Sequence, residues 1–280
     1  MDTIEDFSER LDITPGMGKL YNEILGSLGH DMLTAPGDLV DNSIDAGATN
    51  VEIYIEEDKN GITKFMIADN GSGMTKDILH ESNRIGAATT HSPGANGKFG
   101  TGGSIASYTL GDRKTTYTRH DVAEFILKSN LSLEAIGSPT PLKLGVAGNE
   151  ETTFFNELIP ETGTLIIIDN MKKNLQYSKA YTYATALQDY FGITYCHMLG
   201  PGLSISVIYK NAASRELKTL KVEPFDPIYY GNPDLTHSSR TQTINYEYEN
   251  SDGEKVQSDI VLRFTRMNAA AIGPIVTGKP

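Results

Sequence analysis

The chain has 280 residues, and its 24 basic and 36 acidic side chains leave a formal net charge of −12 at pH 7. This length accommodates one large domain or two modest ones, and the negative charge without any basic run opposes broad binding to nucleic acid or anionic membranes. A single cysteine, Cys196, excludes an internal disulfide and indicates a reducing compartment. With an acidic N-terminus and no long apolar stretch, we expect a cytoplasmic protein, or a nuclear one in a eukaryote, with no membrane partner.

The first part of the chain alternates helical and strand patterns. Apolar residues at helical spacing predict helices over about 17–29 and 32–46. Alternating apolar and polar residues then predict strands over 50–58 and 63–70, and a short helix follows over 75–82.

A stretch rich in glycine, alanine and threonine follows at 83–103. It is too weakly apolar for a regular element, and loops of this length in compact domains tend to be functional. A helix over 102–109 comes next. Beyond it, four short segments have strand-like patterns, at 113–119, 122–128, 152–158 and 164–168.

The last part begins with a long predicted helix at 178–199 and strands at 203–209 and 217–222. Two alternating runs then flank the turn "NSDGEK" and predict a β-hairpin. Pro, Gly, Asn and Ser gather in 223–240, so we expect a boundary there.

This boundary predicts two domains. Residues 1–222 form the first, and 223–280 contain a linker and the hairpin. Because a lone hairpin is marginally stable, this second region either packs on the first domain or begins a further one.

Four motifs carry chemical groups, and the first is "DLVDNSIDAGAT". Asp38, Asn42 and Asp45 line one helical face, and Val40 and Ile44 line another that can be buried. A carboxylate one turn from an amide suits metal-assisted hydrolysis, with the amide oxygen as an Mg²⁺ ligand and the carboxylate orienting a water. The commoner origin of such spacing, taken alone, is a solvated helix face.

The second motif, "ADNGSGM", has an acid at a strand end followed by Gly71 and Gly73. Asp69 there can accept a hydrogen bond from an amino group on a ligand, while the glycines let the backbone approach closely. An ordinary turn between a strand and a helix, without a ligand, explains the same residues equally well.

The third motif, "GANGKFGTGGSIAS", places glycines before a helix, where backbone amides bind phosphate and Lys98 can add a charge. It is neither a Walker P-loop nor a dinucleotide fingerprint. The fourth, "ETGTLIIID", opens a strand with Gly163 and Thr164. The Thr164 hydroxyl can join a ligand's hydrogen-bond network, although a β-branched strand residue needs no such role.

In order and spacing, these motifs resemble the nucleotide-binding motifs of the GHKL ATPase superfamily over residues 17–222, with the Microrchidia, MutL and heat-shock chaperone types closest. The resemblance implies the Bergerat fold, an α+β two-layer sandwich. Its mixed, mainly antiparallel sheet would carry helices on one face. A transducer-like β-rich region would begin after residue 222.

The resemblance also implies roles for individual residues. Asn42 would bind Mg²⁺ at the ATP phosphates, Asp38 would be catalytic, and residues 84–98 would form an ATP lid. Asp69 would bind the adenine amino group, partly through a water held by Thr164. The implied nucleotide-binding residues are Asn42, Asp45, Ala46, Asp69, Gly71, Gly73, Met74, Lys98, Phe99, Gly100, Thr101, Gly102, Gly103 and Thr164.

Most ATP hydrolases of the superfamily have Glu where this chain has Asp38. A carboxylate set back by on the order of 1 Å can cost about 10²-fold in rate. We therefore expect Mg²⁺-dependent ATP binding with slow hydrolysis, and lid closure coupled to homodimerisation, in a DNA-transaction or chromatin-like ATPase. Any DNA contact would come through other regions. The alternatives are a nucleotide sensor with little turnover and a heat-shock-type chaperone.

Overall fold

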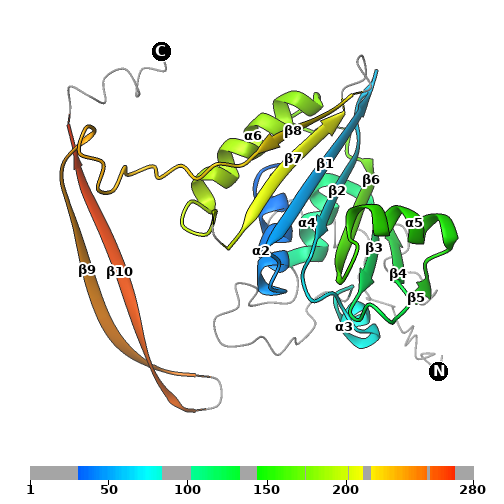
Figure 1. Ribbon diagram of the computed structural model, residues 1–280, viewed down its shortest axis with the longest axis horizontal. Coiled ribbons are helices and arrows are strands. Elements are labelled where there is room, and N and C mark those ends of the chain that lie inside the picture. The colour runs from blue at the N-terminus through cyan, green and yellow to red at the C-terminus, as the bar shows by residue number, and fades with distance from the viewer. Residues whose placement is uncertain are drawn as a thin grey trace, which may run out of the picture. The chain divides into compact units, whose positions relative to one another are not determined.

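The computed structural model describes residues 31–83, 102–132, 144–173, 175–200, 202–210, 216–250 and 253–268 (Figure 1). Its helices are α2 (Thr34–Asp45), α3 (Lys76–Glu81), α4 (Gly102–Leu110), α5 (Asn149–Leu158) and α6 (Ala180–Thr194). The strands are β1 (Asn50–Asp58), β2 (Gly61–Asp69), β3 (Gly111–Arg119), β4 (Leu127–Ser132), β5 (Leu144–Val146), β6 (Gly163–Met171), β7 (Ser204–Lys210), β8 (Leu217–Lys221), β9 (Thr236–Glu249) and β10 (Lys255–Met267). The predicted helix at 17–29 lies outside the described residues.

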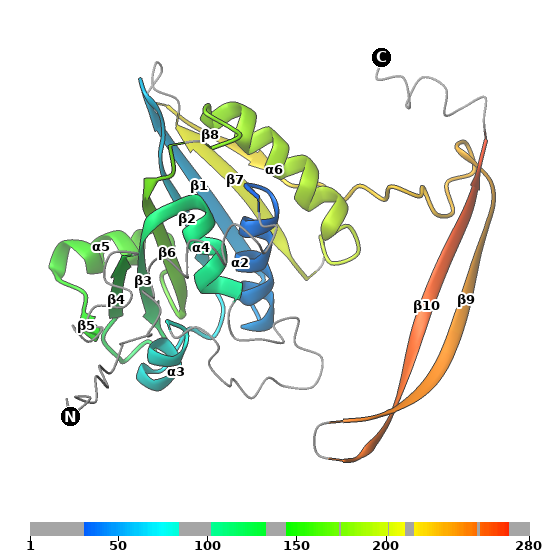
Figure 2. The ribbon, with the colours of Figure 1, turned by 180° about the vertical axis from the view of Figure 1, so that it is seen from behind.

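Eight strands form one sheet in the order β5-β4-β3-β6-β2-β1-β7-β8. All its neighbouring strands are antiparallel except β1 and β7, which are parallel. The predicted fold class is therefore confirmed, namely a mixed, mainly antiparallel sheet with helices packed on it. Figure 2 shows α2, α4 and α6 over one face of this sheet.

Two predicted strands are wrong. Residues 152–158 belong to α5, although their threonines and phenylalanines favour a strand. The helix is favoured locally by acidic residues in its first turn, where the Glu151 carboxylate accepts a hydrogen bond from the Gly148 amide at 2.9 Å. Residues 122–128 are mostly a turn, because the Asp121 carboxylate binds the amide of Ala123 at 2.9 Å, and the strand begins only at Leu127.

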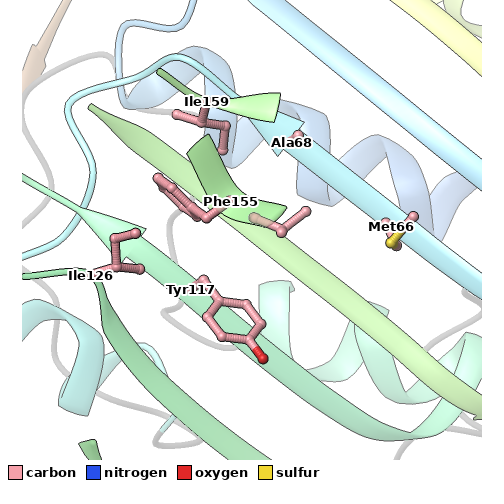
Figure 3. Close-up of a cluster of buried hydrophobic side chains, with 7 residues drawn as sticks. Met66, Ala68, Tyr117, Ile126, Phe155 and Ile159 are labelled. Atoms are coloured by element: carbon pink, nitrogen blue, oxygen red, sulfur yellow. The ribbon is translucent and has the colours of Figure 1, made fainter. Parts of the chain in front are cut away.

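Helices were expected on one face of the sheet only, and this detail is wrong, because α5 covers the second face. Residues that alternate along β2 point to opposite faces. Phe65 meets Tyr183 of α6, with ring centroids 6.2 Å apart, whereas Met66 and Ala68 face Phe155 of α5. Figure 3 shows this second cluster, whose members are Met66, Ala68, Tyr117, Ile126, Phe155, Ile159 and Leu165.

The described residues divide into two compact units. The first ends at Glu223 and lacks the short stretch Gly192–His197, which belongs with the residues from Pro224 onward in the second unit. In the second unit, β9 and β10 pair as an antiparallel hairpin, as predicted. Its register places Ile244 opposite Ile260 and, on the same face, further apolar residues that are exposed, namely Tyr246, Tyr248, Leu262 and Phe264. None of the helices described here is both long enough and apolar enough to span a membrane.

Candidate functional site

Asp69 is a buried carboxylate at the end of β2, with 7% of its surface exposed. Its Oδ2 accepts a hydrogen bond from the Ser43 hydroxyl of α2 at 3.0 Å, and its Oδ1 accepts one from the Gly71 amide at 2.9 Å. Burial raises the pKa of Asp69 above its usual value, and these hydrogen bonds only partly oppose that rise. The sheet thus carries a desolvated acid that is held in place from two sides.

A row of polar side chains crosses three strands at this point. Asp69 of β2 pairs with Thr164 of β6, and Thr164 pairs with Thr118 of β3. The Thr118 hydroxyl donates to the Gly163 carbonyl at 3.1 Å and accepts from the Met74 amide at 2.8 Å. It also lies 3.1 Å from the Thr164 hydroxyl, so both threonines are fixed by hydrogen bonds beside the acid.

The loop after β2 is fastened to α2 and to β3. The Ser72 amide donates to the Ala46 carbonyl at 2.9 Å, and the Ser72 carbonyl lies 2.8 Å from His120 Nδ1. Gly73 adopts a φ of 63°, and a Cβ there would be 2.1 Å from the Arg119 carbonyl oxygen. Only glycine fits this approach, so the loop is held tightly against the end of β3.

Gly163 is equally constrained. Its φ is 150°, and a Cβ at this position would lie 2.0 Å from the Asp69 carbonyl oxygen. The start of β6 therefore lies directly against the end of β2. This close approach of the two backbones brings Thr164 beside Asp69.

The helix α2 contacts this acid through Ser43. Asn42 and Asp45 are exposed, and Asp38 is half-buried. The buried face of the helix includes Val40, as predicted, but it continues through Ser43, while Ile44 is only half-buried. The Ser43 hydroxyl bonds to Asp69, so the helix is rotated with a polar group toward the sheet.

The glycine motif is described only in part. Lys98, Phe99, Gly100 and Thr101 lie outside the described residues, as does the predicted lid at 84–98. Gly102 and Gly103 open α4, which packs beside α2 (Figure 2). The structure thus brings Ala46, Asp69, Gly71, Gly73, Met74 and Thr164 together, and the phosphate-binding role of the other predicted residues stays a prediction.

Sequence reasoning missed two residues of this site, Ser43 and Thr118. Ser43 follows Asn42 directly in the first motif, so its position was a usable signal. The role of Thr118 depends on the pairing of β3 with β6, which joins residues 46 positions apart. The alternation of Thr116, Tyr117 and Thr118 could have indicated that two threonines share one strand face.

Comparison with known proteins finds a family match over part of the chain. The sequence model of the histidine kinase-, DNA gyrase B- and HSP90-like ATPases matches residues 30–140. This range contains α2, the Asp69 motif and β3. Over these residues the chain is similar to the GHKL ATPases, and the match supports an ATP-binding ATPase module.

Individual relatives are similar over shorter stretches. The DNA mismatch repair protein MutL of Borreliella afzelii is 52% identical over 42 residues, which is 15% of this chain and 6% of that protein. MutL of Colwellia psychrerythraea is equally similar over the same length, 15% of this chain and 6% of its own. MutL of Phenylobacterium zucineum is 33% identical over 82 residues, or 29% of this chain and 13% of that protein. The chain thus matches only a small part of each relative.

Proposed function

We propose that the chain binds ATP with Mg²⁺ at the Asp69 site and hydrolyses it slowly. The observation that supports this most strongly is the buried row formed by Asp69, Thr164 and Thr118. A carboxylate has about four lone-pair positions, and the Ser43 hydroxyl and the backbone amides of Gly71 and Thr164 use three of them, so Asp69 can still accept from one amino group. Adenine presents such a group, and a water on Thr164 would complete its recognition.

The residues fit a magnesium ion that arrives with the nucleotide. The described residues contain no cluster of three or more His, Cys, Asp and Glu side chains that could hold a metal. Mg²⁺ usually keeps several waters and takes one or two protein oxygens together with substrate phosphates. The exposed amide of Asn42 is an oxygen ligand of that kind. When bound, the ion would neutralise charge developing on the phosphates.

Asp38 is the residue that we assign to catalysis. It lies one helical turn before Asn42 and is half-buried, a position from which a carboxylate can align a water beside the phosphates. The shorter side chain, compared with the superfamily's usual Glu, supports slow turnover. The same observation favours a second candidate, a nucleotide sensor that binds ATP without appreciable hydrolysis.

The proposal extends to the behaviour of the larger protein. Closure of residues 84–98 over ATP would be coupled to homodimerisation, in a DNA-transaction or chromatin-like ATPase. Residues 1–222 would be the ATP-binding domain. Residues 223–280 would begin a transducer-like region, because the exposed apolar face of the β9–β10 hairpin needs further residues to cover it.

Phosphate release with Mg²⁺ and ATP tests the hydrolysis. An ATPase shows release above background that is lost in Asp38→Ala and in Asp69→Asn. Release at background, with ATP binding intact in the wild type, would establish the sensor instead. An absence of ATP binding by the wild-type chain would refute both.

A further inference from the structure

Arg119 is a buried arginine at the end of β3, with 7% of its surface exposed. Its side chain points to the α5 side of the sheet, because its neighbour Thr118 points to the other side. The guanidinium lies over the ring of Phe155, 5.4 Å from the ring centroid. This cation is therefore enclosed beneath α5, behind the row that contains Asp69.

The guanidinium binds a continuous stretch of backbone. It donates to the carbonyls of Ile159 at 3.2 Å, Pro160 at 2.7 Å and Glu161 at 2.6 Å. A fourth hydrogen bond reaches the Asn156 side chain at 2.9 Å. These carbonyls follow the C-terminus of α5, where a positive charge is favourable. One side chain thus fixes the whole connection that leads into β6.

The same residue touches both constrained glycines of the site through its main chain. The Arg119 carbonyl lies against Gly73, and Arg119 pairs with Gly163 across the β3–β6 ladder. The connection fixed by the guanidinium ends at Gly163, directly before Thr164. Arg119 therefore holds the loop on one side of Asp69 and the strand start on the other.

We propose that Arg119 is a positioning residue that sets the base specificity of the nucleotide site. This inference rests on the proposed function. Asp69 and Thr164 recognise an amino group only while their separation is fixed, and the Arg119 fork fixes the segment that carries Thr164. Without the Arg119 side chain, the separation between Asp69 and Thr164 is no longer fixed. The binding preference for adenine over a base with a carbonyl in place of the amino group then decreases.

Binding of non-hydrolysable ATP and GTP analogues, measured by calorimetry with Mg²⁺, tests this role. We expect Arg119→Ala to weaken ATP-analogue binding by about tenfold, the effect of losing roughly one well-placed hydrogen bond. Binding of the GTP analogue should change much less, so that the ratio of the two dissociation constants moves toward one. Arg119→Lys should keep part of the preference for the ATP analogue that Arg119→Ala loses. An ammonium can bind one or two of the carbonyls, but it lacks the planar fork of the guanidinium.

The matched control is Ile126→Ala. Ile126 belongs to the same cluster beneath α5, with 3% of its surface exposed, but it belongs to no part of the proposed site. Both variants should lower the thermal midpoint, and only Arg119→Ala should change the ratio. If Arg119→Ala and Ile126→Ala show the same ratio of the two dissociation constants, the inference is wrong. Arg119 would then contribute to stability alone.

Two further results keep the test decisive. If Arg119→Ala does not fold, Asn156→Ala removes a single contact of the fork and should shift the ratio in the same direction by a smaller factor; an unchanged ratio there counts against the inference. If the wild-type chain binds no ATP analogue, the proposed function fails and the inference fails with it. If the wild type binds and Asp69→Asn does not, only the role of Arg119 remains in question.

Discussion

Asp69 and Thr164 face each other across the β2–β6 pair, and the Thr164 hydroxyl lies 3.1 Å from the Thr118 hydroxyl on β3. All three residues are at least nine-tenths buried, and further residues on this face of β2 and β6, namely Ile67, Phe65 and Ile168, are buried and apolar. Buried polar groups in folded proteins are generally hydrogen-bonded, so such a row is either fully satisfied internally or completed by a ligand. The position of this row at the end of β2, beside the glycine loop, favours a ligand.

Thr118 should prove essential to the site although it lies outside the four motifs. Thr118→Val keeps the shape but removes the partner of the Met74 amide and of the Thr164 hydroxyl. We expect a loss of about 1–3 kcal/mol in the free energy of unfolding and weaker ATP binding. Urea denaturation and calorimetry measure the two effects. Thr116→Val, on the same strand face and equally buried, is the control and should leave binding unchanged.

Asp69→Asn should separate stability from binding. Because burial raises the folded-state pKa of Asp69, the folded protein holds this proton more tightly than the unfolded chain. Wild-type stability therefore falls as the pH rises from below the usual value of 3.8 through the raised pKa. Without nucleotide at pH 7, the Asn variant should be at least as stable as the wild type, and this advantage should vanish on acidification. A lower thermal midpoint at pH 7 would contradict this account of Asp69.

The length of the side chain at position 38 should control turnover. Asp38→Glu adds one methylene and should raise kcat, by up to about 10²-fold if the carboxylate of Asp38 is set back by about 1 Å. Asp38→Ala should abolish turnover and preserve nucleotide binding. Asp41→Ala, on the same helix, is the control. An Asp38→Glu variant with unchanged or lower kcat would show that reach does not limit the reaction.

Gly73 should tolerate no side chain, and comparison with Gly47 separates steric overlap from backbone strain. Both glycines have positive φ, 63° and 76°, but a Cβ on Gly73 would meet the Arg119 carbonyl at 2.1 Å, whereas nothing lies within 4 Å of one on Gly47. Gly47→Ala should cost about 1–3 kcal/mol through backbone strain alone. Gly73→Ala should cost more and also weaken nucleotide binding. Equal losses in denaturation experiments would mean that the loop can move away from β3.

Glu151 should stabilise the attachment of α5 in a pH-dependent way. Lys128 lowers the pKa of Glu151 to about 2, with further contributions from Gly148 and Tyr117. A lowered folded-state pKa gives stability that is complete above the unfolded value near 4.5 and is lost as the pH falls toward 2. Glu151→Gln should therefore be less stable than the wild type at pH 7, and the difference should shrink below about pH 4.5. A difference independent of pH would exclude this ionisation as its cause.

Most of the fold could be predicted because its signals are local. The alternation in β1 and β2 and the helical spacing in α2 are present in short stretches of sequence. The helix α5 could not be predicted in this way, because its threonines and phenylalanines favour a strand. Its helical state depends on capping by Glu151 and on the burial of Phe155 against the sheet.

The site residues also differ in whether their signals are local in the sequence. Asp69 and the glycines that follow it are adjacent in sequence, so their chemistry could be predicted. Thr118 and Arg119 gain their roles from the β3–β6 register and from the packing of α5, both of which join distant parts of the chain. Residues 98–101 remain predicted phosphate contacts.

The central claim is that the Asp69 site binds adenine nucleotide. Isothermal titration of the wild-type chain and of Asp69→Asn with a non-hydrolysable ATP analogue in the presence of Mg²⁺ tests it most directly. We predict saturable binding by the wild type and none by a folded Asp69→Asn variant. Equal binding by the two proteins, or no binding by the wild type, would contradict the account.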